Sequence, residues 1–238
     1  NHENLISPYN FAILKTKEEF DKDKQFILKT VLPIYNFQET VSKEQIDLFI
    51  TDLAEKWQSS QMDTIATLDM ETYKDKGVEL LSHLYNKGVI SINNRYQAKG
   101  ADFEKTSDTD SNYNFTLLNN NVATQKNTEN CYSIDKAIIY LRQRIEQDKD
   151  ISKKRWLVEI LSNYVTVNYI FNESLTEKTE QNALNNISTT RGMVQKGELI
   201  AERDKIVNND TYQKLESLRK VFDDEAKITG NKNYVALG

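Results

Sequence analysis

Apolar side chains recur at three- and four-residue spacing over several long stretches of this chain, which is the pattern of one buried face of an α-helix. Little interrupts these stretches, because the 238 residues include only 2 Pro and 7 Gly, the residues that most often stop helices. The stretches are 46–57, 70–86, 137–145, 156–161 and 212–222. The pattern therefore predicts a mostly helical protein.

Polar residues mark where several of these helices begin and end. Thr16, followed by Glu18 and Glu19, predicts an N-cap, and the helix is expected to stop near Thr30, ahead of Pro33. The segment Ser42-Lys-Glu-Gln45 reads as a capping box. Gly88 is the expected stop of the second long helix. Further helix starts are expected at Ser133 and at Asn209 or Asp210.

Short extended segments lie between the helices. Strands are predicted at 9–14, 88–92 and 165–171, and a hairpin at 115–124 that turns on the asparagines 119–121. Residues 100–114 are polar and predict a loop. The fold class is therefore α+β, mostly helical with one or two small antiparallel β elements. We interpret 1–238 as a single domain, with a β and loop insertion near 88–130 as the one candidate subdivision.

The segment from Thr189 to Val207 breaks the helical pattern near the end of the chain. Gly192 and Gly197 predict structural turns, and Ile206-Val207 predicts a further short strand. We interpret the segment as a small β element docked on helices.

Composition and motifs argue against nucleic-acid binding and against the common kinds of catalytic and metal site. The net charge is −5 with acids and bases interspersed, so nucleic-acid binding is disfavoured. The single cysteine, Cys131, rules out an intramolecular disulfide, and the histidines number only 2. The sequence has no phosphate-binding loop, nucleophile elbow or zinc spacing. We therefore predict no catalytic residue, metal site or cofactor in this chain.

The residue order near both ends resembles one bacterial family. Ser188-Thr-Thr-Arg-Gly-Met-Val-Gln-Lys-Gly-Glu-Leu-Ile200, followed by Tyr212-Gln-Lys-Leu-Glu-Ser-Leu218, is similar to the end of the extracytoplasmic domain of seven-helix membrane receptors that carry an intracellular HD-type phosphohydrolase. Upstream, Ile6-Ser-Pro-Tyr-Asn-Phe11, Val31-Leu-Pro-Ile-Tyr35 and Tyr169-Ile-Phe-Asn-Glu-Ser-Leu-Thr-Glu-Lys178 resemble earlier parts of it. One departure is Asp204-Lys205, where the family often has a second glycine followed by Glu.

The resemblance implies an extracytoplasmic sensor-type domain on the periplasmic face of a bacterial inner membrane, tethered through segments outside this chain. The parent would be a cyclic dinucleotide phosphodiesterase, with cyclic di-AMP as the substrate in the better-known members. This chain lacks a His-Asp pair and is not expected to be an enzyme.

Two main functions stay open at this stage. A sensor domain would bind an extracytoplasmic ligand or protein, and the aromatic-rich residues would line its pocket: Tyr35, Phe37, Trp57, Tyr164 and Tyr169. Arg191 would meet an anion. A structural domain would instead form a homodimer or bind a protein partner through exposed aromatics such as Tyr212 and Phe222. A free periplasmic binding protein is a third and weaker alternative.

Overall fold

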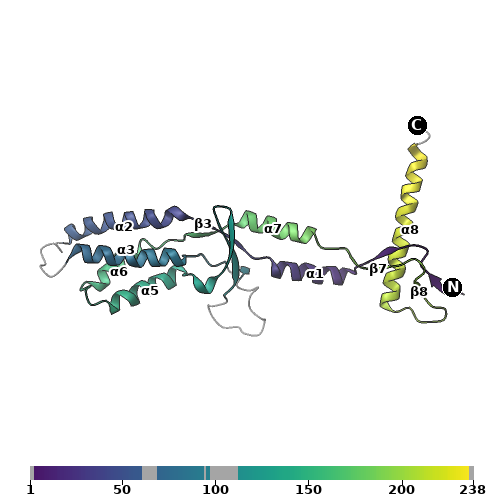
Figure 1. The fold of residues 1–238 in the computed structure, drawn as a ribbon, viewed down its shortest axis with the longest axis horizontal. Coiled ribbons are helices and arrows are strands. Elements are labelled where there is room, and N and C mark those ends of the chain that lie inside the picture. Colours follow the sequence, from purple (N-terminus) through teal and green to yellow (C-terminus); the bar gives the residue numbers. More distant parts are fainter. Residues whose placement is uncertain (1–2, 61–68, 94, 97–111, 236–238) are drawn as a thin grey trace. The chain divides into compact units, whose positions relative to one another are not determined.

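The computed structural model describes residues 3–60, 69–93, 95–96 and 112–235, and side chains up to residue 227. The chain folds into two compact units (Figure 1). The terminal unit contains residues 1–31 and 180–238, and the central unit contains residues 32–179. The boundaries between the units, 31/32 and 179/180, lie outside the segment 88–130, and the interpretation of 1–238 as a single domain stays a prediction.

The terminal unit joins the first strands of the chain to its last strands and last helix. Strand β1 pairs with β8 and β2 pairs with β7, both antiparallel, so residues about 190 positions apart in sequence lie side by side. The elements are β1 (Leu5–Ile6), β2 (Phe11–Leu14), α1 (Lys17–Thr30), β7 (Thr190–Val194), β8 (Leu199–Ala201) and α8 (Asn209–Val235). A small core fills the space between strands and helix: Phe11, Ile13, Val194, Ile200 and Leu218.

Helix α1 begins and ends where the sequence predicts. The Thr16 side chain accepts a hydrogen bond from the Glu19 N–H (3.1 Å), and the Glu19 carboxylate accepts one from the Thr16 N–H (2.8 Å). The helix ends at Thr30, before Pro33. This reciprocal pair satisfies two backbone donors that a helix start leaves without partners.

The central unit combines a helical layer with a four-stranded sheet of order β5-β4-β3-β6. The β3–β4 pair is parallel and the other two pairs are antiparallel. The elements are β3 (Ile34–Phe37), α2 (Glu39–Ser59), α3 (Met70–Lys87), β4 (Asn114–Asn119), β5 (Val122–Asn127), the 3-10 turn η2 (Thr128–Asn130), α5 (Ile134–Gln147), α6 (Lys154–Ser162), β6 (Tyr169–Phe171) and α7 (Glu173–Asn185), whose last residues belong to the terminal unit.

Helices α2, α3, α5 and α6 bury the faces that the apolar spacing predicts. Their shared core includes Phe49, Leu53, Trp57, Tyr73, Leu80, Leu81, Leu84, Ala137, Leu141, Ile145, Leu157, Ile160 and Leu161. The α+β class, dominated by helices, is confirmed.

The predicted capping box at Ser42 is wrong. Helix α2 already begins at Glu39, directly after β3, and Ser42 lies inside its first turns. Val41 packs against the helical core, so burial extends the helix one turn upstream of the polar signal.

One strand prediction, the hairpin, is confirmed, and the other predicted strands are shorter in the structure or absent from it. The hairpin β4–β5 turns on Asn120 and Asn121, with φ of 45° and 66°, as the asparagine run predicts. The predicted strand 88–92 reduces to two isolated bridges, Val89 to Tyr132 and Ile90 to Tyr169. Of 165–171, only β6 is a strand. Ile206-Val207 is not a strand, and most of the predicted loop 100–114 lies outside the described residues.

Candidate functional site

The residues singled out in the sequence fall in both units. Arg191, Gly192 and Gly197 lie in the terminal unit, whereas Tyr35, Trp57 and Tyr169 lie in the central unit. The three aromatics do not share one cluster. Trp57 belongs to the helical core, and Tyr35 and Tyr169 belong to a second core that contains side chains of the sheet strands.

Tyr35 and Tyr169 are buried, and both of their hydroxyls form hydrogen bonds within the protein. Tyr35 is 0% exposed, and its hydroxyl bonds the Tyr113 hydroxyl (2.7 Å) and the Ser91 carbonyl (3.1 Å). Burial and the Tyr113 hydrogen bond raise the pKa of Tyr35 far above its ordinary value, so it stays a phenol. The Tyr169 hydroxyl accepts a hydrogen bond from the Lys126 ammonium (2.8 Å).

Trp57 is held among other aromatic rings. Its indole meets Tyr73 and Trp156 edge to face, with ring centroids 5.1 and 5.9 Å apart. Phe37 packs in the same manner on Tyr169. These contacts are typical of aromatic cores. The ligand-binding roles of these aromatics stay predictions.

Of the two predicted turn residues, only Gly197 lies in a turn. It has φ of +86° in the connection between β7 and β8, and its N–H donates to the Ser7 carbonyl (2.9 Å). Gly192 instead lies within β7, opposite Ile13, so the predicted turn there is wrong. The register skips Arg191, which makes it the bulged residue of the β2–β7 pair.

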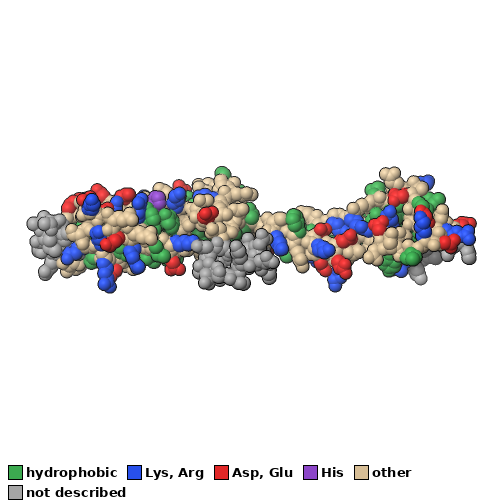
Figure 2. Space-filling model, turned by 90° about the horizontal axis from the view of Figure 1, so that it is seen from below, with side chains coloured by type: hydrophobic (Ala, Val, Ile, Leu, Met, Phe, Trp, Pro, Cys, Tyr) green, Lys and Arg blue, Asp and Glu red, His purple; other side chains and the backbone are tan. Residues whose placement is uncertain are grey.

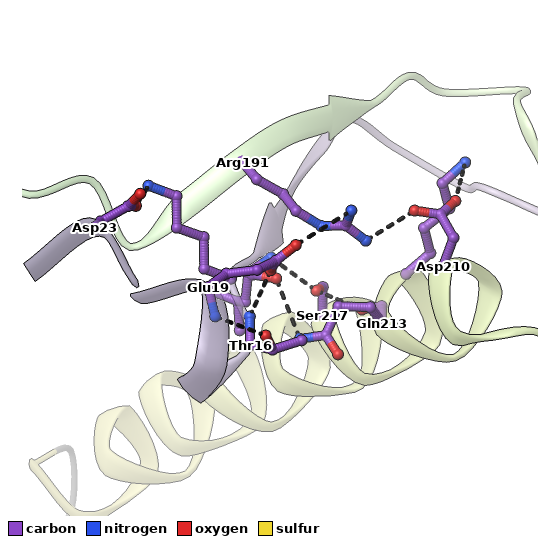
Figure 3. A network of polar contacts seen from close by, with 10 residues as sticks. Thr16, Glu19, Asp23, Arg191, Asp210, Gln213 and Ser217 are labelled. Atoms are coloured by element: carbon purple, nitrogen blue, oxygen red, sulfur yellow. Dashed lines mark hydrogen bonds and ion pairs between the residues drawn. The ribbon is translucent and has the colours of Figure 1, made fainter. Parts of the chain in front are cut away.

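Arg191 occupies the centre of a polar network in the terminal unit (Figure 3). Its guanidinium lies 2.8 Å from Asp210 at the start of α8 and 3.6 Å from Glu19 in the first turn of α1. Glu19 is the same carboxylate that closes the α1 capping box. Arg191 is therefore neutralised by two carboxylates and connects three elements.

Helix α8 binds β2 through two polar side chains one turn apart. The Leu14 N–H donates to the Ser217 hydroxyl (2.9 Å), and the Gln213 amide donates to the Leu14 carbonyl (3.1 Å). Ser217 is 1% exposed and donates onward to the Gln213 carbonyl (2.6 Å). The two side chains thus satisfy both backbone groups of Leu14, as a neighbouring strand would (Figure 3).

Further bonds tie the start of the chain to the β7–β8 region. The Asn10 side chain accepts from the Lys196 N–H (2.7 Å), and the Asn4 side chain accepts from the Arg203 N–H (2.8 Å). Lys214 of α8 pairs with Glu198 at 3.2 Å. We call β1, β2, β7, β8 and residues 209–222 of α8 the terminal clamp.

The sequence analysis missed Ser217 and Gln213. Their only signal is a pair of polar residues at i and i+4 beside the apolar positions Leu215 and Leu218. Such a pair is common on exposed helix faces, and its role becomes visible only once the β2 backbone lies against it.

Neither a metal-ligand cluster nor an activated cysteine occurs among the described residues. None of their His, Cys, Asp and Glu side chains form a group of three that could hold a metal ion. Burial raises the pKa of the Cys131 thiol to about 11, which keeps it protonated and unreactive. On the face that Figure 2 shows, acidic and basic side chains are interspersed.

Comparison with known proteins gives one match. The family described as 7TM-HD extracellular matches residues 2–221, which includes both units and most of the terminal clamp. No curated protein and no solved structure matches the chain. Among the helices described, none combines the length and apolar character that crossing a membrane requires.

Proposed function

Because the chain belongs to the family of 7TM-HD extracellular domains, we propose that it is the input domain of a membrane-bound HD-type cyclic dinucleotide phosphodiesterase. In this proposal the domain lies on the periplasmic face of the inner membrane, and the intracellular HD domain hydrolyses cyclic di-AMP. The extracellular domain itself is not catalytic. It passes a signal to the hydrolase through the membrane helices.

The terminal clamp is the observation that carries this proposal. The first strands of the chain and its last helix share one small core and one hydrogen-bond network. A displacement of α8 along β2 would break both bonds to Leu14, so we expect the clamp to change between discrete arrangements rather than over a continuous range. A ligand that favours one arrangement would increase the population of that arrangement, and both ends of the domain would then change position together.

The architecture is tested in the parent gene and in cells. We expect one apolar span before this segment, several spans after it, and then a His-Asp motif. Lys149 is exposed and Cys131, the one cysteine of this chain, is buried, so Lys149→Cys provides a thiol that is accessible where the native one is not. A membrane-impermeant thiol reagent should label this variant in cells whose outer membrane is permeabilised. A cleavable signal followed by a stop codon after this segment would contradict the proposal.

A second candidate function is assembly with another copy of the chain. Apolar side chains reach the surface of the terminal unit at Ile6, Phe26, Met193, Leu199, Ile206, Val207, Tyr212 and Phe222. A contiguous exposed apolar patch built from such residues would favour an interface.

Sedimentation of the wild-type chain and of an Ile206→Lys, Tyr212→Lys variant tests the assembly function. Ile206 is 96% and Tyr212 56% exposed, so the fold should tolerate both changes. A dimer that the variant dissociates supports assembly. A wild-type monomer at high concentration contradicts it.

A further inference from the structure

A polar pocket of about 480 Å³ opens in the central unit, where the end of α3 meets the β4–β5 hairpin. Its volume falls in the range of sites that hold small molecules. The lining residues are Asn86, Lys87, Asn114, Gln125, Lys126, Asn127 and Asn130. Every one is an amide or a lysine. The lining therefore carries two positive charges in a chain whose net charge is −5.

Most of the polar groups of this pocket are not used within the protein. Among the described residues, hydrogen bonds and ion pairs are absent from four lining side chains: Asn86, Lys87, Gln125 and Asn130. Asn127 donates its side-chain N–H to the Asn114 side-chain oxygen (2.8 Å), which fixes that pair across the hairpin. Each free amide can both donate to and accept from a hydroxyl group.

Both lysines belong to the lining of the same pocket, Lys87 at the end of α3 and Lys126 in β5. Lys126 is held in place by the Tyr169 hydroxyl, and its ammonium lies 5.0 Å from the centre of the Tyr169 ring. Two lysines without a carboxylate among the described lining residues favour an anion.

The composition of the pocket selects among anions. The described lining residues include no aromatic ring, which disfavours a nucleobase, because bases bind by stacking. They also include no apolar side chain, which disfavours a fatty acid or an apolar peptide. Amides suit hydroxyl and acetamido groups, and lysine ammonium groups bind carboxylate and phosphate alike.

We propose that this amide–lysine pocket binds a small anionic saccharide, either a sugar acid or a sugar phosphate. The inference rests on the proposed input function, for which it supplies a class of signal. Lys87 and Lys126 contact the acidic group, and the amides of Asn86, Gln125 and Asn130 contact the hydroxyl groups.

Calorimetric and NMR titrations of the chain test the proposal with four probes: glucuronate, glucose 6-phosphate, glucose and inorganic phosphate. We expect at least one of the two anionic sugars to saturate a single site and to shift the side-chain amide resonances of the lining residues. Glucose and phosphate alone should bind at least about tenfold more weakly, since each lacks one half of the contacts.

Two variants and a control distinguish the effect of the pocket's charge on binding from a general effect of substitution on the folded protein. Lys87→Gln should weaken binding of the anionic sugar about tenfold, the effect of losing one charge-assisted hydrogen bond. Gln125→Glu places a carboxylate in the lining and should abolish that binding. Lys178→Gln removes an exposed lysine outside the pocket and should leave binding within about twofold of the wild type.

Three results would overturn the inference. They are no saturable binding of either anionic sugar, binding that Lys87→Gln leaves unchanged, and binding of inorganic phosphate as tight as that of the tighter-binding anionic sugar. None of these depends on the hydrolase. A failure here therefore leaves the input function intact, whereas failure of the architecture test would leave a sugar-binding protein of another kind.

Discussion

At Gly197 the backbone adopts φ of +86°, and no heavy atom lies within 4 Å of the place where a Cβ would stand. Only conformation, and not space, therefore requires glycine there. Gly197→Ala should lower the free energy of unfolding by about 1–3 kcal/mol. Gly192→Ala is the matched control, because its Cβ would meet only Ile13 at an ordinary 3.8 Å. Equal urea midpoints for the two variants would refute the turn assignment.

Ser217 is the residue on which the clamp most depends. Replacing it by alanine leaves the Leu14 N–H without an acceptor in a largely buried position. Ser217→Ala should therefore destabilise the terminal unit by about 1–3 kcal/mol and speed hydrogen exchange at the Leu14 amide. Ser217→Thr keeps the hydroxyl and should restore slow exchange. Unchanged exchange in the alanine variant would show that the bond is unimportant.

Between elements, one ion pair joins α3 to the end of α5. The Lys76 ammonium lies 3.0 Å from Asp148, the residue that follows α5, and also pairs with Glu79. Partial burial raises the pKa of Asp148, but the Lys76 and backbone hydrogen bonds outweigh it, and the net pKa is lowered.

The lowered pKa has a defined consequence for stability. A carboxylate with a lowered folded-state pKa stabilises the protein above its unfolded pKa, about 3.9, and that contribution is lost as pH falls through the folded pKa. Asp148→Asn should therefore reduce the urea midpoint at pH 7 and make a much smaller difference near pH 2. The Asn side chain keeps an acceptor for the Asp150 N–H. An equal difference at both pH values would contradict the assigned ion pair.

The helices were predictable and strands β1 and β3 were not, for a physical reason. Buried positions of a helix recur every three to four residues within one segment. The spacing of Phe49, Leu53 and Trp57 therefore predicts their shared buried face from the local sequence alone. Strands β1 and β3 have two and four residues, and their partners lie far away in sequence, so local pattern carries little information about them. Asn120 and Asn121 are the exception, because the turn they form is itself local.

For the whole molecule, two units with separate cores predict two unfolding events. Gly88 has φ of +99°, and a Cβ there would clash with the Tyr169 ring of the central unit. Gly88→Ala should therefore lower the transition of the central unit, and Ser217→Ala that of the terminal unit. Hydrogen exchange read segment by segment during urea unfolding distinguishes them. A single event that both variants shift equally would show one cooperative unit.

The site was less predictable than the fold. The sequence directs attention to Arg191 and Gly197, because an unusual residue order reveals a local β element. Arg191 lies in β7 of the terminal clamp, and Gly197 lies in the turn that joins β7 to β8. The sequence cannot show that Ser217 and Gln213 bond Leu14, since that contact joins residues some 200 positions apart. The amide–lysine pocket was missed for the same reason, because its lining comes from α3, the hairpin and η2.

The most direct test of the input function measures cyclic di-AMP hydrolysis by the full-length receptor in membrane vesicles. The Gln213→Ala, Ser217→Ala variant removes both α8 bonds to Leu14, and Lys220→Ala on the exposed side of the same helix is the control. We predict that the double variant changes the hydrolysis rate, that the control does not, and that Ser217→Thr preserves the wild-type rate. Equal rates in the wild type and the double variant, with faster Leu14 exchange confirmed in the latter, would contradict transmission through the terminal clamp.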